Sequence, residues 1–276
     1  MKLKKKEHQR PKRIGKLIDS SYFSKRRLFF IMKDRFSQQA DNYQKYRPTY
    51  PKELYTFILD LVADKGIAWD CGTGNGQVAS KLSEYFEQVY ATDISEQQLQ
   101  QAPVLPNVSY KVERAEHTSF SSHQFDLITV AQAIHWFDFD LFYQEVKRTL
   151  KPSGILAVMG YGLHETDASI QPIIHHFYTT IVGPYWDKER TYLDENYQTI
   201  PFPFKEIKTP SFTHTMQWSL PQLLGYLNTW SAVKLYEKKE SLNPLSLIED
   251  DLKKAWGAED HTRSVTFPIL LRIGKV

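Results

Sequence analysis

Three glycines and two aspartates stand at a spacing that can hold a nucleoside. Gly72, Gly74 and Gly76 form the run Gly-Thr-Gly-Asn-Gly shortly after Asp70. Glycine tolerates a positive φ and lets the backbone come into contact with a ligand. Asp93 lies 21 residues beyond Gly72, where a carboxylate can accept hydrogen bonds from ribose hydroxyls. The pattern predicts a nucleoside-binding turn, and the alternative is a tight strand-to-helix turn that binds no ligand.

The residue after the third glycine distinguishes two classes of ligand. The dinucleotide fingerprint G-x-G-x-x-G requires its third glycine one position later, where this chain has Gln77. This departure disfavours a pyrophosphate site and, with it, a nicotinamide-dependent oxidoreductase. S-adenosylmethionine carries no phosphate, so the carboxylate of Asp70 beside the turn would not repel it. We therefore predict S-adenosylmethionine as the cofactor.

Three other side chains are candidates for contact with a ligand. His135 follows an expected strand at 125–131, and ligands of parallel sheets bind at the carboxyl ends of strands. It could act as a base or as a hydrogen-bond donor to the substrate, and the alternative is a structural role in its loop. Trp136 is expected as a wall of the cofactor site or as a core aromatic. Arg47 can bind a carboxylate, of a methionine moiety or of a substrate, through two parallel hydrogen bonds; its alternative is a surface ion pair.

Alternating strands and helices are expected to position these residues. The expected strands are 66–71, 88–93, 108–113, 125–131 and 155–161. The expected helices are 51–61, 77–86, 95–101 and 139–150, and Ser95 is expected to be the N-cap of the third. Strands that alternate with helices predict an α/β fold, in which helices cover both faces of a mostly parallel sheet.

The region 161–263 departs from this alternation and is rich in aromatic residues. Helices are expected at about 168–182, 220–236 and 245–256. Two further strands, at 211–218 and 263–275, are expected to form a hairpin that brackets inserted helices. The region has ten basic and fourteen acidic side chains, a net charge of −4. Such a surface binds phosphate poorly, so a lid or a hydrophobic core is favoured over the stacking of nucleobases.

The composition excludes several classes of protein. Hydrophobic residues make up 41% and charged residues 24% of the 276 residues, which supports a substantial core and argues against disorder. No apolar run approaches the roughly 20 residues needed to span a bilayer, so no membrane span is predicted. The single cysteine, Cys71, excludes a disulfide scaffold and a multi-cysteine zinc site. No metal is predicted, because the adjacent His175 and His176 would point in different directions on a helix.

Residues 1–31 carry much of the basic charge. They hold eleven Lys or Arg and two acids, a net charge of +9 in a chain of +3, so the other 245 residues carry −6. We expect a disordered extension, with Met32 as a candidate for the true start, and a domain at 32–276. The alternative is a polybasic arm that binds a membrane or nucleic acid. The apolar stretch 28–32 is shorter than the roughly 7–15 residues of a secretory signal core, and we expect a cytoplasmic protein.

Several segments resemble the motifs of the class I S-adenosylmethionine-dependent methyltransferases. They are 69–76 (WDCGTGNG), 90–93 (YATD), 125–136 (FDLITVAQAIHW) and 150–156 (LKPSGIL). The resemblance covers about residues 34–276. Within this superfamily the chain is most similar to the branch that contains trans-aconitate methyltransferase and other small-molecule methyltransferases. That similarity rests on 43–51 (YQKYRPTYP), 133–137 (AIHWF) and 226–231 (YLNTWS).

The resemblance implies a Rossmann-like sheet of seven strands, the last of them antiparallel, and a helical lid carried by 162–263. The residues implied to bind the cofactor are Arg47, Asp70, Gly72, Gly74, Gly76, Asp93, Ala115, Glu116 and Gln132. The implied catalytic residue is His135, and the residues implied to meet the substrate are Trp136, Tyr185 and Trp186. One departure concerns the adenine pocket, where many relatives have an acid or a small polar residue and this chain has Arg114. The Ala115 backbone and the Glu116 side chain are the remaining candidates there.

The resemblance also implies an enzyme that transfers a methyl group to a small-molecule acceptor, with a carboxylate oxygen favoured. Methyl transfer is an in-line displacement, in which the enzyme mainly aligns the reactants and excludes water. A carboxylate acceptor is already ionised and needs no base, whereas a hydroxyl or an amine would need one. The alternatives are an RNA methyltransferase that uses the basic arm and a non-catalytic nucleotide-binding module. We expect a monomer or a homodimer.

Overall fold

The structure is a computed structural model that describes residues 46–258 and 261–276, all within the unit Arg35–Val276. The extension expected at 1–31 and the start expected at Met32 lie outside the described residues. The segment 43–51 is described only from Tyr46 onward.

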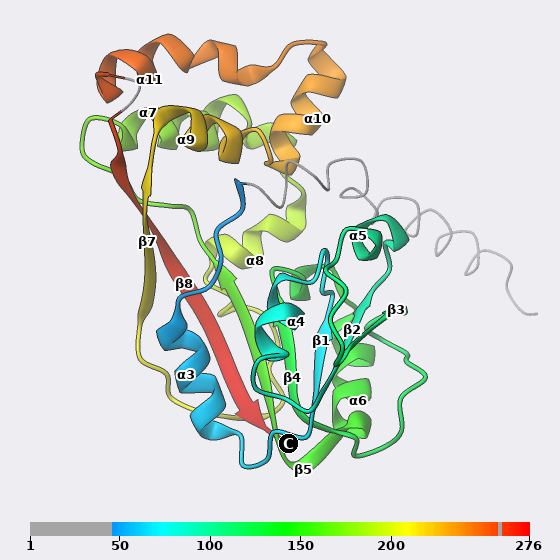
Figure 1. Ribbon diagram of the computed structural model, residues 1–276. Coiled ribbons are helices and arrows are strands. Elements are labelled where there is room, and N and C mark those ends of the chain that lie inside the picture. The colour runs from blue at the N-terminus through cyan, green and yellow to red at the C-terminus, as the bar shows by residue number, and fades with distance from the viewer. Residues whose placement is uncertain (1–45, 259–260) are drawn as a thin grey trace, which may run out of the picture. The chain divides into compact units, whose positions relative to one another are not determined.

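One mixed sheet forms the centre of this unit (Figure 1). Its parallel strands are β1 (Ile67–Cys71), β2 (Gln88–Asp93), β3 (Val108–Val112), β4 (Phe125–Ala131) and β5 (Leu150–Tyr161). The remaining strands are β6 (Lys205–Glu206), β7 (Phe212–Trp218) and β8 (Arg263–Lys275). The strand order is β3-β2-β1-β4-β5-β8-β6, and β7 also pairs with β8. The predicted α/β fold with a mostly parallel, Rossmann-like sheet is confirmed.

The sheet has eight strands within the described residues, so the expected count of seven is wrong. The difference arises because two strands, β6 and β7, pair with the same side of β8. β6 lies opposite Lys275 and Gly274, and β7 lies opposite the residues from Arg263 to Ile269. The linker between β6 and β7 contains Pro210, which has no N–H to donate to a ladder. The expected antiparallel hairpin of β7 and β8 is confirmed.

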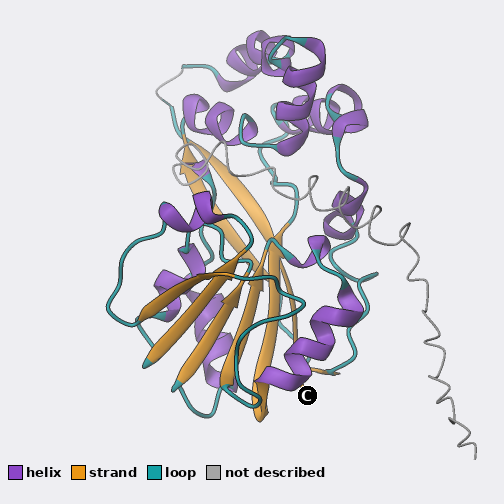
Figure 2. Cartoon of the chain, turned by 90° about the vertical axis from the view of Figure 1, so that its right-hand side faces the viewer, coloured by secondary structure: helices purple, strands orange, loops and turns teal. Residues whose placement is uncertain are grey.

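Helices cover both faces of the sheet (Figure 2). They are α3 (Lys52–Leu61), α4 (Gln77–Leu82), α5 (Glu96–Gln100) and α6 (Phe139–Thr149). Ala68 of β1 packs in one buried cluster with Leu54 of α3, whereas the next residue, Trp69, packs in a second cluster with Phe142 of α6. This alternation explains why β1 is apolar on both faces, as parallel strands usually are. In the described part of the chain, no helix is both long and apolar enough to cross a membrane.

Two insertions supply the remaining helices. Between β5 and β6 lie α7 (Gln171–His176), a π-helical turn η3 (Phe177–Ile181), the 3-10 turns η4 (Gly183–Tyr185) and η5 (Lys188–Arg190), and α8 (Thr191–Asp194). Between β7 and β8 lie α9 (Leu220–Leu227), α10 (Ser231–Glu240), a 3-10 turn η6 (Pro244–Leu247) and α11 (Glu249–Trp256). Figure 1 shows α7, α9, α10 and α11 gathered beyond one end of β7 and β8. The insertions pack on each other, since η4 contacts α10 and the ring of Phe177 lies 5.9 Å from that of Trp230.

The single helix expected at 220–236 is wrong, because the chain breaks it into α9 and α10. Thr229 causes a local stop: its Oγ1 donates to the carbonyl of Tyr226 at 2.6 Å, and its N–H donates to the same oxygen at 2.9 Å. A threonine hydroxyl that bonds to the preceding turn competes with the helical ladder. Trp230 then adopts extended backbone, with φ −68° and ψ 134°.

Candidate active site

The glycine turn between β1 and α4 has left-handed backbone at each of its three glycines. Their φ values are 69° at Gly72, 57° at Gly74 and 81° at Gly76. A side chain with Cβ is strained in this region, which explains the glycines. The N–H groups of Gly72 and Thr73 both donate to the carbonyl of Thr92 at 2.9 Å. The turn is therefore fastened to the carboxyl end of β2.

The space around the three glycines differs: two of them pack closely against other residues, and one has room for a ligand beside it. A Cβ at Gly72 would lie 2.6 Å from Cβ of Ala133, and one at Gly76 would lie 2.7 Å from Oη of Tyr110. Among the described residues, a Cβ at Gly74 would meet only Oε1 of Gln98, at 3.8 Å. The protein's own packing thus leaves room above Gly74. This cradle fits a ligand that lies against the backbone of the turn, as the predicted cofactor would.

Asp70 lies beneath the turn. Its carboxylate is buried and accepts hydrogen bonds from Oγ1 of Thr73 at 2.5 Å, from Oγ1 of Thr129 at 2.8 Å and from the N–H of Ala79 at 3.0 Å. Burial raises the pKa of Asp70 to about 6, although these three hydrogen bonds oppose the rise. The bonds connect the turn with β4 and α4, so Asp70 stabilises the conformation of the turn. Its direct contact with the cofactor stays a prediction.

Asp93 stands at the end of β2, next to the turn. Its Oδ2 accepts from the N–H of Gly74 at 2.8 Å, and its Oδ1 accepts from the N–H of Ser95 at 2.9 Å. Ser95 in turn accepts from the N–H of Gln98 and caps α5, as expected. Each carboxylate oxygen can accept more than one hydrogen bond. The structure therefore brings Asp93 and Gly74 together, and the contact with a ribose stays a prediction.

The segment after β3 is held against the start of α6. Ala115 is buried, and Oε1 of Glu116 accepts from the N–H of Asp138 at 3.1 Å. Oε2 of Glu116 forms an ion pair with Nε of Arg114 at 3.1 Å. Burial opposes ionisation of Glu116, but the Asp138 N–H and Arg114 outweigh it and lower the pKa. Glu116 is thus charged and positioned, whereas its predicted role at the adenine ring is untested.

The loop after β4 begins with a strained residue. Gln132 has a φ of 55°, which is uncommon for a residue other than glycine. Two bonds to β5 hold it: its N–H donates to the carbonyl of Met159 at 3.0 Å, and its Nε2 donates to the carbonyl of Tyr161 at 3.1 Å. Strain of this kind persists where the surroundings fix it and is concentrated at functional sites. It supports the prediction that Gln132 borders the site.

His135 lies in the 3-10 turn η2 (Ile134–Trp136) of the same loop and is 8% exposed. Its ring lies 4.9 Å from that of Trp136 and stacks on Tyr197 at 6.3 Å. Its Nδ1 is buried without a hydrogen-bond partner among the described residues. Burial, together with the positive charge of Arg190, lowers the pKa of His135 to about 3. The imidazole is therefore neutral at physiological pH and is a weak base.

Arg47 joins two elements that are far apart in the sequence. Its Nη1 donates to Oη of Tyr161 at 3.1 Å, and its Nη2 donates to the carbonyl of Thr229 at 3.2 Å. Its guanidinium also lies 5.7 Å from the ring centre of Tyr226. Arg47 thus ties the end of β5 to the turn between α9 and α10. A contact with the methionine carboxylate stays a prediction.

The two lid aromatics predicted to meet the substrate have different surroundings. Oη of Tyr185 donates to Oε1 of Glu240 at 2.7 Å, and its ring lies 4.7 Å from that of Tyr236, so both contacts are with α10. Trp186 instead packs in an aromatic cluster, with its ring 5.5 Å from that of Trp230. Sequence reasoning missed Arg190, whose guanidinium lies 4.8 Å from the ring centre of Trp186. In the charged run 187–190 no spacing distinguishes it from a surface arginine.

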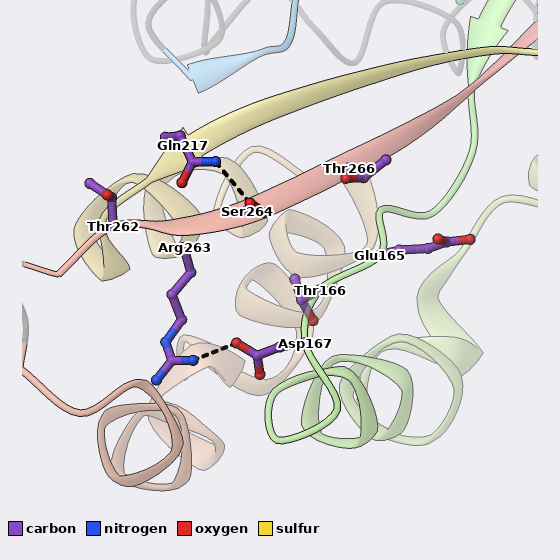
Figure 3. A pocket seen from close by; sticks show the side chains of 8 residues that line it. All are labelled: Glu165, Thr166, Asp167, Gln217, Thr262, Arg263, Ser264 and Thr266. Carbon is purple, nitrogen blue, oxygen red and sulfur yellow. Dashed lines mark hydrogen bonds and ion pairs between the residues drawn. The ribbon is translucent and has the colours of Figure 1, made fainter.

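A polar cleft occurs elsewhere, at the ends of β7 and β8 (Figure 3). Its lining residues are Glu165, Thr166, Asp167, Gln217, Thr262, Arg263, Ser264 and Thr266. Their polar groups bond largely to one another: Arg263 pairs with Asp167 at 2.5 Å, and Gln217 donates to Ser264 at 2.8 Å. None of the residues predicted to bind the cofactor lines this cleft. The cofactor site at the glycine turn stays a prediction.

Comparisons with known proteins agree with this geometry. A family profile described as a methyltransferase domain matches residues 69–158, which run from β1 to β5. A protein of Dictyostelium discoideum assigned as a methyltransferase is 34% identical over 250 residues, which are 88% of this chain and 95% of the relative. An uncharacterised methyltransferase of Schizosaccharomyces pombe is 23% identical over 242 residues, 85% of this chain and 93% of the relative.

A solved structure supports the same assignment. It is assigned as a type II methyltransferase from Anaeromyxobacter dehalogenans, is 36% identical in sequence and has a TM-score of 0.78. The match covers 83% of this chain and 98% of that chain. The glycine turn, the strand order and these relatives together show that the chain belongs to the class I S-adenosylmethionine-dependent methyltransferases.

Proposed function

We propose that this protein transfers a methyl group from S-adenosylmethionine, its cofactor, to a carboxylate oxygen of a small molecule. One observation carries the choice of a carboxylate. His135, the side chain predicted to act on the acceptor, has a pKa lowered to about 3 by burial and by Arg190. General-base catalysis is most effective when the pKa lies near the working pH. A carboxylate acceptor is ionised at neutral pH and needs no such base.

The residues of the turn would hold the cofactor. The backbone of 72–76 would border the nucleoside, Asp93 would accept from the ribose, and Ala115 with Glu116 would border the adenine. Gln132 and Arg47 would face the methionine portion. When bound, S-adenosylmethionine supplies an electrophilic methyl group on a sulfonium.

The protein's own part in the reaction is then to orient the acceptor and to exclude water. His135, kept neutral by burial, would contribute a hydrogen bond or shape rather than accept a proton. Trp136 beside it would form the wall of the acceptor site. Both follow β4, at the edge of the sheet where ligands of this fold class bind.

The insertions at 162–263 would act as the lid over the acceptor. Their aromatic cluster, which includes Tyr178, Trp186 and Trp230, can exclude water from the site. Their net charge of −4 disfavours a nucleic-acid acceptor. This division of the domain, the basic extension at 1–31 and the relation to the trans-aconitate methyltransferase branch are parts of the same proposal.

A transfer assay tests the proposal. S-adenosylmethionine labelled on its methyl group is incubated with the full chain and, separately, with pools of small carboxylic acids, alcohols, amines and RNA. We expect label to enter the carboxylic acid pool only. Label in RNA or in the amine pool, with none in the acids, would overturn the proposed acceptor class but leave the methyltransferase assignment intact.

A further inference from the structure

A second arginine stands close to His135. Arg190 ends η5, and η5 packs against η2, the turn that carries His135. Burial is the larger cause of the lowered pKa of His135, and the positive charge of Arg190 is the second cause. Arg190 thus brings a positive charge from the lid insertion to the loop after β4, at the ligand-binding edge of the sheet.

The guanidinium of Arg190 is held from one side. Its Nε donates to Oη of Tyr178 at 2.8 Å and lies 3.5 Å from Oδ1 of Asp194. Its carbon centre lies 4.8 Å from the ring centre of Trp186 and 5.4 Å from that of Tyr178. Contact with two aromatic rings and a bond at Nε together fix the plane of the group. Its orientation is therefore set before any ligand arrives.

The two terminal nitrogens of Arg190 are not used in this anchoring. In the described part of the chain neither Nη1 nor Nη2 donates a hydrogen bond, and the side chain is 20% exposed. The other arginine of the site differs, because Nη1 and Nη2 of Arg47 donate to Tyr161 and Thr229. Arg272 and Arg263 likewise donate through their terminal nitrogens, to carbonyls and carboxylates of the protein. Of these four arginines, Arg190 is the one whose terminal nitrogens donate no hydrogen bond within the described residues.

We propose that Arg190 binds a carboxylate of the methyl acceptor through Nη1 and Nη2, and that it makes the site specific for anionic acceptors. A guanidinium presents two parallel donors that match the two oxygens of a carboxylate. The aromatic face of Trp186 beside it would shield this pair from water and strengthen it. This inference rests on the proposed function, since it names the residue that selects the acceptor at the same site.

The test uses 4-fluorobenzoate as the anionic probe and 4-fluorobenzamide as its neutral counterpart. Binding of each to the full chain, saturated with S-adenosylhomocysteine, is followed by fluorine NMR. We expect saturable binding of the benzoate and about tenfold or greater weakening in Arg190→Gln, the loss typical of a charged hydrogen bond. Arg190→Lys keeps the charge but not the fork, so it should restore the affinity only in part.

The control variant is Lys188→Gln, which removes the same charge from an exposed side chain of the same turn, η5. It should bind the benzoate as the wild type does.

Equal affinity of the benzoate for the wild type and Arg190→Gln would overturn the inference, as would equal affinity of the wild type for benzoate and benzamide. Failure of the proposed function gives a different result. If methyl groups enter only alcohols or amines while benzoate binding still depends on Arg190, the acceptor class is wrong and the anion site stands. If methyl esters form with unchanged kcat/KM in Arg190→Gln, the function stands and the inference is overturned.

Discussion

A substitution at Gly74 tests whether the cofactor occupies the space beside this residue, because the substitution causes no clash within the protein. It has a φ of 57°, and a Cβ added there would meet no atom closer than Oε1 of Gln98, at 3.8 Å. Gly74→Ala therefore introduces left-handed strain of about 1–2 kcal/mol without a clash inside the protein. In a domain of this size, such strain lowers Tm by about 2–8 °C.

A bound cofactor changes the outcome, because the new methyl group would occupy the space that the nucleoside needs. Overpacking of a filled site costs about 1–3 kcal/mol, which corresponds to a loss of affinity of about 5- to 150-fold. Isothermal titration of S-adenosylmethionine into the wild type and Gly74→Ala measures this loss. Thermal unfolding of the two ligand-free proteins measures the strain separately.

Gly257→Ala is the matched control. Gly257 also has a positive φ, 84°, and no atom of the described residues lies within 4 Å of an added Cβ. It ends α11, outside the glycine turn, so this variant should lose stability but keep wild-type affinity. Wild-type affinity in Gly74→Ala would refute the cradle, and an equal loss of affinity in both variants would attribute the effect to strain alone.

Three further predictions concern other parts of the structure. His164→Phe should raise the free energy of unfolding by about 1–3 kcal/mol at neutral pH, because neither ring nitrogen of the buried His164 has a partner among the described residues. Burial lowers the pKa of His164 from 6.5 to about 3, so the unfolded chain binds the proton more tightly and the wild type loses stability as the pH falls from 6.5 toward 3. The variant should lack this part of the pH dependence, and identical urea-unfolding profiles for both proteins across that range would contradict the reasoning. Gly225→Ala should destabilise the protein by about 1–3 kcal/mol, because its Cβ would lie 2.5 Å from the ring of Tyr46; Gly183→Ala, whose Cβ would meet nothing closer than 3.6 Å, should cost less in the same thermal-unfolding assay. His135→Asn should lower the rate of methyl transfer without an alkaline requirement, since a pKa of about 3 makes His135 a weak base; a rate in this variant that rises steeply above neutral pH would count against a carboxylate acceptor.

The sequence predicts best what local spacing determines. The glycines at 72, 74 and 76 predict a turn that needs positive φ, and each of them has a positive φ in the structure. Ser95 has a residue type that is typical of an N-cap, and its side chain accepts from the N–H of Gln98 as expected. The strands β1, β4 and β5 follow from their mainly apolar runs, most of whose residues are buried. Each of these features depends on residues that are near one another in the chain.

What the sequence did not predict depends on contacts between distant segments. The break between α9 and α10 is invisible to apolar periodicity, because it arises from the bonds of Thr229 to Tyr226. Arg190 has no local pattern that separates it from a surface charge. Its importance comes from Tyr178, Trp186 and the loop of His135, which the fold brings to it. The conformation of the glycine turn was therefore predictable from the sequence, whereas the surroundings of Arg190 were not.

The kind of bond that the transferred methyl group forms with the acceptor tests the account most directly. S-adenosylmethionine with a deuterated methyl group is incubated with the full chain and a pool of small carboxylic acids, and the labelled product is treated with mild alkali. The account predicts a methyl ester, so the label should leave as deuterated methanol and the parent acid should be recovered. A label that survives the alkali, as in a methyl ether or a methylated amine, would contradict it.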